Sequence, residues 1–291
     1  MTTDARLLDL AARLRVASRV TVLTGAGVSA ASGVPTFRGP DGLWRSYRPE
    51  TLATPEAFRA DPRLVWEWYG WRRERVAACA PNPAHEVLAR WARERGTTVV
   101  TQNVDDLHVR AGTPGLVRLH GSLWELRCSG LQVPVDGASI DPEPDCRVKD
   151  DRSPEYPHIA GLARVTAVPC LAGQRPWRDE RVPLGAGLPR CPHCGRLARP
   201  AIVWFGEALD EADVAEALAA TDCDVFLAVG TSAVVHPAAG LVHEARRRGA
   251  WTAEINADAT PVSTQVHLAI EGRAEAVLPA VDGLLARQPG R

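Results

Sequence analysis

The chain has 291 residues, of which 45% are hydrophobic and 24% are charged, and these proportions exclude a disordered, collagen-like or disulfide-scaffold protein. The formal charge of -1 and the isoelectric point near 6.7 lack the basic excess of a general nucleic-acid binder. No stretch approaches 18 apolar residues and no leader or anchor is visible, so we expect a cytoplasmic protein with neither a membrane nor a nucleic acid as partner.

Helical and extended patterns alternate along the chain. Leucines at helical spacing predict a helix near residues 7–14, and the apolar β-branched run from Val20 to Leu23 predicts the first strand. Further strands are expected at 97–101, 225–229 and 251–255, with helices near 83–95, 210–220 and 237–247. This alternation predicts a parallel sheet covered on both faces, and therefore the α/β class.

Two stretches interrupt the alternation. Residues 34–80 begin as a Pro/Gly loop and continue as a Trp-rich helix at about 62–79, and residues 128–200 are rich in Pro, Gly, Asp and Arg. We therefore expect a large part built from about 1–33, 81–127 and 201–291, and a smaller part built from the two insertions, 34–80 and 128–200.

A glycine-rich turn follows the first strand directly. Gly25-Ala26-Gly27 opens the pattern G-x-G-x-x-G/A, which in dinucleotide-binding folds lets the backbone approach a pyrophosphate. The same turn can also join a strand to a helix without any ligand. A dehydrogenase would next show a strand ending in an acidic residue, whereas this chain continues as a loop through Phe37 and Arg38, which counts against hydride transfer.

Polar residues also follow the later strands. Open α/β sheets bind ligands at the carboxyl ends of their strands, and the amides, hydroxyls and carboxylates found there suit a nucleotide. A helix cap at Asp105 or Asp106 is an equally good explanation of the first of these segments. The candidates are Gln102, Asn103 and Asp105 after the second strand, Gly230, Thr231 and Ser232 after the third, and Asn256 and Asp258 after the fourth.

His120 is the candidate general base. It lies in the segment Leu119-His120-Gly121-Ser122, in a loop between expected strands. A histidine titrates near neutral pH and can remove a proton from a sugar hydroxyl. A single histidine among the eight in this chain can equally have a structural role.

The seven cysteines, an odd number, favour thiols or metal ligation over disulfides. Cys191 and Cys194 have the C-x-x-C spacing of a zinc knuckle, and a structural zinc needs four ligands in a tetrahedron. Ser129, Gly130 and Leu131 follow Cys128 where a partner thiolate is expected. Our hypothesis is that Cys128, Cys191, Cys194 and either Cys170 or Cys146 bind zinc, and the alternative is that no zinc is held.

In chain order, these blocks resemble the signature segments of sirtuins, which are NAD-dependent protein lysine deacylases. The matching segments span nearly the whole chain and include Gly25 to Gly39, Thr101 to Asp105, Leu119 to Gly121 and Val229 to Ser232. The resemblance implies a Rossmann-like parallel-sheet domain that carries NAD, and a smaller inserted domain of zinc-ribbon and helical type. It also implies acylated lysine side chains of proteins as the partner.

The resemblance assigns roles to individual residues. Pro200 to Glu207 is similar to the segment that pairs with the substrate peptide, here through Val203 and Phe205, and His120 matches the catalytic base. NAD is consumed: nicotinamide leaves and the acyl group passes to ADP-ribose. The implied cofactor-binding residues are Gly25, Ala26, Gly27, Phe37, Arg38, Gln102, Asn103, Asp105, Gly230, Thr231, Ser232, Asn256, Asp258 and Ala274.

Tyr69 and Arg72 are the candidate specificity residues. They are three apart on an expected helix, so they share a face and can offer a hydroxyl and a guanidinium to one carboxylate. Without the family context, a packed tyrosine and a solvated arginine explain them as well. The Tyr-x-x-Arg pair resembles that of the sirtuin class that removes succinyl and malonyl groups.

Two other functions remain as alternatives. One is an ADP-ribosyltransferase or NAD hydrolase on the same scaffold, distinguished by where the ADP-ribose ends up. The other is a binding protein for NAD or acyl-lysine without turnover, which His120 argues against.

Overall fold

The computed structural model describes residues 3–35, 47–131, 169–185, 187–232 and 238–287. Its contacts divide the chain into two compact units. Unit 1 comprises Met1–Gly42, Arg75–Ser122 and Ala208–Arg291, and unit 2 comprises Leu43–Glu74 and Leu123–Glu207. The boundaries expected from the sequence, near 33, 80, 127 and 200, and the assignment of NAD to the larger part stay predictions. Among the described residues, no helix has both the length and the apolar character needed to cross a membrane.

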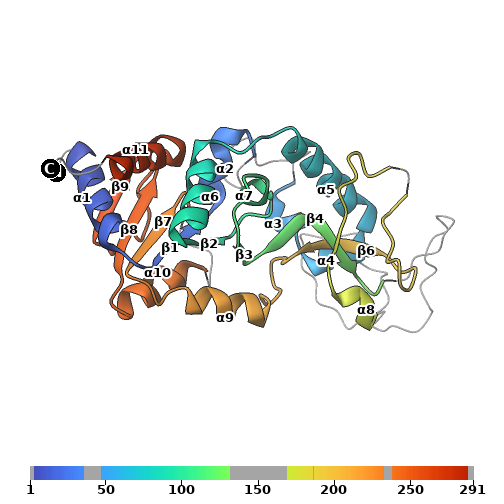
Figure 1. Cartoon of the computed structure of the whole chain (residues 1–291). Coiled ribbons are helices and arrows are strands. Elements are labelled where there is room, and N and C mark those ends of the chain that lie inside the picture. The colour runs from blue at the N-terminus through green and yellow to red at the C-terminus, as the bar shows by residue number, and fades with distance from the viewer. Residues whose placement is uncertain (1–2, 36–46, 132–168, 186, 233–237, 288–291) are drawn as a thin grey trace. The chain divides into compact units, whose positions relative to one another are not determined.

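Unit 1 contains a six-stranded parallel sheet in the order β3-β2-β1-β7-β8-β9 (Figure 1). The strands are β1 (Val20–Thr24), β2 (Thr98–Thr101), β3 (Val117–Arg118), β7 (Val225–Val229), β8 (Trp251–Asn256) and β9 (Leu268–Glu271). The central strands are continuous apolar or β-branched runs because both of their faces are buried. The predicted α/β class and parallel sheet are confirmed. The short strands β3 and β9 were not predicted.

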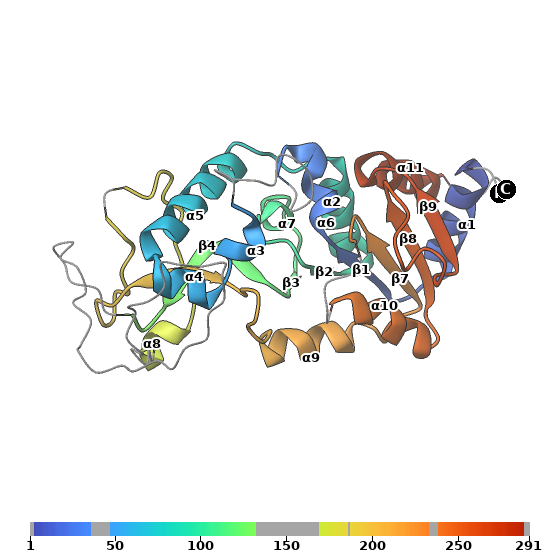
Figure 2. The same cartoon turned by 180° about the vertical axis from the view of Figure 1, so that it is seen from behind.

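Alternate residues of the central strands pack into two separate cores. Val225 and Leu227 of β7 join the core beneath α1 (Thr3–Val16), α6 (Pro83–Arg95) and α11 (Ala274–Ala286). Phe226 and Ala228 join the core beneath α9 (Glu211–Ala219) and α10 (Ala238–Arg247). The reverse view shows these two groups of helices on opposite faces of the sheet (Figure 2). The period of two along each strand therefore produces a three-layer α/β unit.

Local signals explain where helix α6 begins and ends. The Asn82 side chain accepts a hydrogen bond from the Ala84 backbone N–H at 2.9 Å, and His85 Nδ1 accepts one from the Asn82 N–H at 3.3 Å. Pro83 occupies the first helical position, where its missing N–H costs nothing. Gly96 ends the helix with a left-handed φ of 64°.

Unit 2 contains a three-stranded sheet in the order β5-β4-β6 and several short helices. The strands are β4 (Gly121–Cys128), β5 (Trp177–Arg178) and β6 (Ala198–Ile202), and the helices are α3 (Pro49–Leu52), α4 (Pro55–Ala60), α5 (Pro62–Ala77) and α8 (Leu171–Gln174). Residues 121–122 of β4 and 75–77 of α5 fall within the bounds of unit 1. Arg73 of α5 is buried, donates to the Leu123 carbonyl at 2.8 Å and forms an ion pair with Asp179 at 3.0 Å. Arg73 therefore links α5 to β4 and to the residue that follows β5. Short segments α2 (Ala26–Ser29), η1 (Ala30–Ser32) and α7 (Leu107–Arg110) belong to unit 1.

A buried pair of histidines lies between the first two strands and their helices. The rings of His85 and His108 are 4.8 Å apart, His108 Nε2 lies 3.0 Å from Thr24 Oγ1, and His85 Nε2 lies 3.3 Å from Ser29 Oγ. Burial lowers the pKa of His85 to about 4 and, with the neighbouring His85, lowers the pKa of His108 to about 3. Both rings are therefore neutral in the folded protein at neutral pH.

We expect this pair to make the fold sensitive to acid. In the unfolded chain both histidines take up protons near pH 6.5, whereas in the folded chain they do so only near pH 4 and pH 3. The unfolded state binds more protons in that window, so the free energy of unfolding falls as the pH drops from about 6.5 toward 4. Thermal unfolding measured across this range should show a falling Tm, with a shallower slope in a His108→Gln variant. The matched control is His243→Gln, at an exposed position of α10. Equal slopes of Tm against pH in the wild type and both variants would mean that other groups cause the acid sensitivity.

Candidate functional site

The predicted cofactor residues gather at one edge of the sheet in unit 1. His120 follows β3, Gln102 follows β2, Gly25 follows β1, Gly230 follows β7 and Asn256 ends β8, and these five strands are neighbours in the order β3-β2-β1-β7-β8. All of these residues lie at the carboxyl ends of parallel strands. The chain proceeds from β1 to β2 on one side, while β7 and β8 lie on the other side, so β1 marks the point where the strand order reverses. Such a switch point is where open α/β sheets bind nucleotides.

The glycines of this edge allow two loops to meet backbone to backbone. A Cβ on Gly25 would lie 2.8 Å from the Thr231 Cβ, and one on Gly27 would lie 2.8 Å from the Gly230 carbonyl oxygen. The Gly27 N–H donates to that carbonyl at 2.8 Å. Gly230 itself has a left-handed φ of 58° and would place a Cβ 2.5 Å from the Val28 nitrogen. The close packing of the two loops therefore requires these glycines, as would the approach of a pyrophosphate. Ala26, at the turn, is half-buried.

Amide side chains cross-link the loops at the strand ends. Gln102 Nε2 donates to Thr231 Oγ1 at 2.9 Å, Asn103 Nδ2 donates to the Gly25 carbonyl at 3.1 Å, and Asn256 Nδ2 donates to the Thr231 carbonyl at 2.9 Å. These bonds hold the loops of β1, β2, β7 and β8 in one arrangement. These amide side chains set the positions of the loops. The arrangement fits a preorganised dinucleotide site.

The remaining cofactor candidates occupy different surroundings. Asp105 is buried and accepts a hydrogen bond from the Leu107 N–H at 2.9 Å, at the start of α7, whose N-cap residue is Asp106 without a side-chain cap hydrogen bond. Asp258 is exposed and lines a cavity of about 570 Å³ together with Arg6, Glu271 and Arg273. Ala274, buried at the start of α11, follows that cavity wall, and Ser232 is half-buried. Phe37 and Arg38 lie outside the described residues.

His120 is held in one tautomer by the backbone. Its Nδ1 lies 2.9 Å from the Gln102 carbonyl oxygen, which can only accept, so Nδ1 carries the proton and Nε2 is left as the basic atom. Burial lowers the pKa of His120, and the hydrogen bond to Gln102 opposes this effect. The imidazole is thus neutral, and ready to accept a proton, at neutral pH.

Asp106 ties down both flanks of the histidine. It has a left-handed φ of 61°, a conformation that aspartate tolerates better than most residues. Its Oδ1 accepts from Ser122 Oγ at 2.9 Å and lies 3.6 Å from an Arg118 guanidinium nitrogen. The carboxylate therefore connects to the residues two before and two after His120.

Tyr69 and Arg72 lie on α5 in unit 2, as the helical spacing predicted. The Arg72 guanidinium lies 5.0 Å from the centre of the Trp68 ring and 5.7 Å from that of Tyr69. Arg72 is half-buried, whereas Tyr69 has no exposed surface and its hydroxyl accepts a hydrogen bond from Trp204 Nε1 at 2.8 Å. Burial raises the pKa of Tyr69, so the phenol stays protonated at neutral pH.

The candidate peptide-binding residues follow strand β6. Val203 is half-buried and Phe205 is 46% exposed, and the Phe205 N–H donates to the Ala53 carbonyl at 2.9 Å. β6 is an outer strand of the β5-β4-β6 sheet. An outer strand with an exposed apolar residue beside it is a setting in which an extended peptide can pair by backbone hydrogen bonds.

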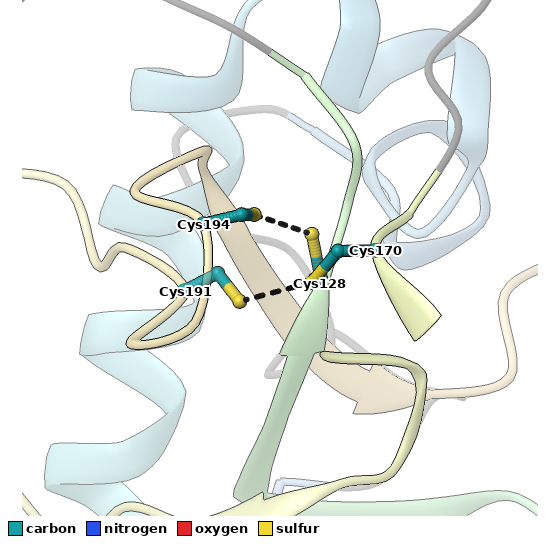
Figure 3. Close-up of side chains that lie close together, drawn as sticks. All are labelled: Cys128, Cys170, Cys191 and Cys194. Carbon is teal, nitrogen blue, oxygen red and sulfur yellow. Dashed lines mark hydrogen bonds between the residues drawn. The ribbon is translucent and has the colours of Figure 1, made fainter. Parts of the chain in front are cut away.

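Four cysteines of unit 2 converge on one point (Figure 3). Sγ of Cys128 lies 3.6 Å from Sγ of Cys194, Sγ of Cys170 lies 3.7 Å from Sγ of Cys191, and all four sulfurs lie within 4.8 Å of one another. Zinc–sulfur bonds of 2.3 Å in a tetrahedron place the sulfurs about 3.8 Å apart. The cluster therefore fits a structural zinc. The fourth ligand is Cys170 in this arrangement, and Cys146 lies outside the described residues.

The backbone around the cluster is built to approach sulfur. The Gly173 N–H donates to Cys170 Sγ at 3.3 Å, and a Cβ on Gly173 would lie 2.8 Å from the sulfurs of both Cys170 and Cys191. A hydrogen bond from the Arg196 backbone lowers the pKa of Cys194 to about 7, whereas burial raises the pKa of Cys128 and of Cys170, so of these three thiols only Cys194 is close to a thiolate before a metal binds. Only glycine fits at position 173.

Sequence reasoning missed several polar residues that support this site. Ser29, His85 and His108 form the buried network behind the glycine turn, and the Asn103 amide also donates to Ser29 Oγ at 3.2 Å. In unit 2, Trp204 contacts Tyr69, and Arg199 and Glu207 surround Trp204. The sequence did contain a signal for these residues: each is a polar or aromatic side chain within an otherwise apolar helix or at the end of a strand.

Comparisons with known proteins agree on one family. A family model described as the Sir2 family matches residues 25–237. The NAD-dependent protein deacylase of Pyrococcus furiosus is 40% identical over 269 residues, which cover 91% of this chain and 92% of that protein. The mitochondrial NAD-dependent protein deacylase sirtuin-5 of Canis lupus familiaris is 38% identical over 284 residues, covering 95% and 84%.

Solved structures show the same fold. A Sir2 homolog in complex with NAD matches with a TM-score of 0.75 and 37% identity, covering 96% of this chain and 94% of that one. A mutant Sir2 homologue in complex with 2'-O-acetyl ADP ribose matches with a TM-score of 0.76 and 35% identity, covering 97% and 99%.

Proposed function

The chain belongs to the Sir2 family, and from this premise we propose that it is an NAD-dependent protein lysine deacylase that prefers succinyl and malonyl groups over acetyl. The family membership supports NAD-dependent deacylation with NAD as co-substrate. The acidic-acyl preference depends on one observation: Tyr69 and Arg72 are neighbours on α5, and the Arg72 guanidinium lies 5.7 Å from the centre of the Tyr69 ring. Both groups are hydrogen-bond donors, as a carboxylate requires.

The residues at the sheet edge of unit 1 would hold NAD. Gly25, Ala26, Gly27, Gly230 and Thr231 surround the turn into α2. The other members of the proposed set are Phe37, Arg38, Gln102, Asn103, Asp105, Ser232, Asn256, Asp258 and Ala274. When bound, NAD supplies the ribose carbon that the acyl oxygen attacks, the nicotinamide leaving group and the hydroxyl that receives the acyl group.

His120 is the proposed base in this reaction. Its Nδ1 proton is held by the Gln102 carbonyl, so Nε2 takes the proton from a ribose hydroxyl. Asp106 keeps the segment that carries His120 in place through Ser122 and Arg118. Val203 and Phe205 would position the substrate peptide beside β6. Cys128, Cys170, Cys191 and Cys194 would hold zinc in a structural role, because all four positions of a tetrahedral zinc are filled by thiolates.

The decisive assay compares matched succinyl-lysine and acetyl-lysine peptides with NAD. Mass spectrometry should show faster loss of succinyl, with one O-succinyl-ADP-ribose and one nicotinamide per deacylated lysine. Preference for acetyl would keep the deacylase and remove the acidic-acyl proposal. Nicotinamide release without deacylation would instead indicate NAD hydrolysis or ADP-ribosyl transfer.

Substitution of Arg72 tests the specificity directly. Arg72→Met keeps most of the apolar stem of the side chain and removes the charged guanidinium, so kcat/KM for the succinyl peptide should fall by about 10- to 100-fold, as expected for loss of a hydrogen bond to a charged group. kcat/KM for the acetyl peptide should change little. The matched control is Arg63→Met, at an exposed position of the same helix. Equal losses on both peptides would make Arg72 a structural residue.

A further inference from the structure

The Tyr69 hydroxyl is only half satisfied inside unit 2. Trp204 Nε1 donates to it at 2.8 Å, and an indole N–H can only donate, so the hydroxyl oxygen acts as the acceptor of this bond. The hydroxyl's own proton has no acceptor among the residues that the structure describes. A buried donor without an acceptor costs free energy unless a ligand satisfies it. A carboxylate is a ligand that only accepts.

Trp204 is held rigidly enough to impose this geometry. The Arg199 guanidinium lies 3.4 Å from the centre of the Trp204 ring, and the Phe58 ring lies 5.3 Å away on centres. The Trp204 backbone N–H donates to Glu207 at 2.8 Å, and Glu207 also pairs with Arg199 at 2.8 Å. The indole therefore cannot turn its N–H away from Tyr69 without breaking these contacts.

We propose that Trp204 is a positioning residue for acyl specificity, which holds the Tyr69 hydroxyl so that its proton is presented to the carboxylate at the end of an acidic acyl chain. This inference depends on the proposed preference for succinyl and malonyl groups. Because Trp204 occupies the hydroxyl oxygen as an acceptor, Tyr69 and Arg72 together offer only donors to a ligand. An acyl chain that ends in a methyl group would leave the buried O–H unpaired, so the pair discriminates against it.

Access to the hydroxyl requires movement. Tyr69 has no exposed surface, so a carboxylate reaches its hydroxyl only when side chains around it shift on binding. Arg72 is half-buried and lies three residues along the same helix, so its side chain is the more accessible of the two. The Trp204 bond keeps the hydroxyl in its orientation during that movement.

The test is a double-mutant cycle read as selectivity, the ratio of kcat/KM for succinyl and acetyl peptides of one sequence. We expect Trp204→Phe to lower the ratio about fivefold and Tyr69→Phe to lower it about tenfold, mainly through the KM for the succinyl peptide. The double variant should match Tyr69→Phe alone, because Trp204 acts through the hydroxyl. The matched control is Trp66→Phe, because Trp66 also packs against Tyr69 but donates its indole N–H to the Ala198 carbonyl at 3.0 Å. Its ratio should stay within twofold of wild type.

The outcomes separate this inference from the proposed function. A wild-type protein without succinyl preference would contradict the proposed acidic-acyl preference, and this inference with it, but not the proposed deacylase activity. Two results would overturn this inference alone. In the first, Tyr69→Phe lowers the succinyl preference and Trp204→Phe does not. In the second, Trp204→Phe has the same effect in the wild type as in the Tyr69→Phe variant. If Trp204→Phe does not fold, 3-benzothienylalanine at position 204 removes only the N–H and keeps the ring. An unchanged ratio in that protein would also overturn the inference.

Discussion

Replacing His120 with alanine is expected to lower kcat/KM for deacylation by about 10²- to 10⁴-fold, the usual contribution of a positioned general base. Nε2 of His120 is its basic atom because Nδ1 donates a hydrogen bond to the Gln102 carbonyl. The measurement is initial-rate kinetics with the acyl peptide that wild type prefers. Thermal unfolding should give a Tm close to that of wild type, because the ring is only half-buried.

The same residue predicts the acidic limb of the pH profile. The base must be neutral to act, and burial lowers the pKa of His120 below the ordinary value of 6.5. The lowered pKa keeps Nε2 unprotonated to a lower pH, so kcat/KM should fall only as the pH drops below 6.5. A His243→Ala variant provides the control for removing a histidine from unit 1. Retention of most activity by His120→Ala would exclude His120 as the base.

Replacing Cys170 with serine is expected to abolish zinc binding and to destabilise unit 2 as a whole. Structural zinc contributes about 10–16 kcal/mol in zinc-finger peptides, which is comparable to or larger than the whole stability of a typical domain. The four cysteines join the end of β4, the start of α8 and the 191–194 turn, so losing the metal separates segments that are far apart in the chain. Metal analysis should give one zinc per wild-type chain and none in the variant, with faster proteolysis of unit 2.

Cys146→Ser is the matched control for this experiment, since Cys146 was the other candidate ligand. It should keep one zinc per chain and wild-type resistance to proteolysis. Loss of zinc in Cys146→Ser and its retention in Cys170→Ser would reverse the assignment of the fourth ligand. A wild-type protein without zinc would mean that the thiols pack without metal. Unit 1 should keep its own unfolding transition in every case, because its two cores contain none of the four cysteines.

The repetitive parts of the fold were readable from local sequence. β7 has the predicted bounds and helix α6 runs from Pro83 to Arg95 as predicted, because apolar runs, an Asn cap and a terminal glycine act over a few residues. The strand-end positions of Gly25, Gln102, Gly230 and Asn256 follow from the same patterns, since parallel strands place their carboxyl ends together. The two-residue strands β3 and β5 carry too few residues for a period to appear, and the four-residue strand β9 was missed although β2, of the same length, was predicted.

The tertiary structure decided the pairings between distant residues. The sequence named Cys170 as the fourth ligand but left Cys146 as an alternative, and the cluster of Cys170 with the other three cysteines came from the path of the chain around β4 and β6. The bond between Tyr69 and Trp204 joins residues 135 positions apart, and the contact between His85 and His108 joins two helices. Local patterns depend on backbone geometry within a few residues, whereas these pairings depend on how whole elements pack. Hence the sequence alone determined which functional groups the site contains and at which edge of the sheet they lie. Only the packing of the tertiary structure determined which other side chains hold those groups in place.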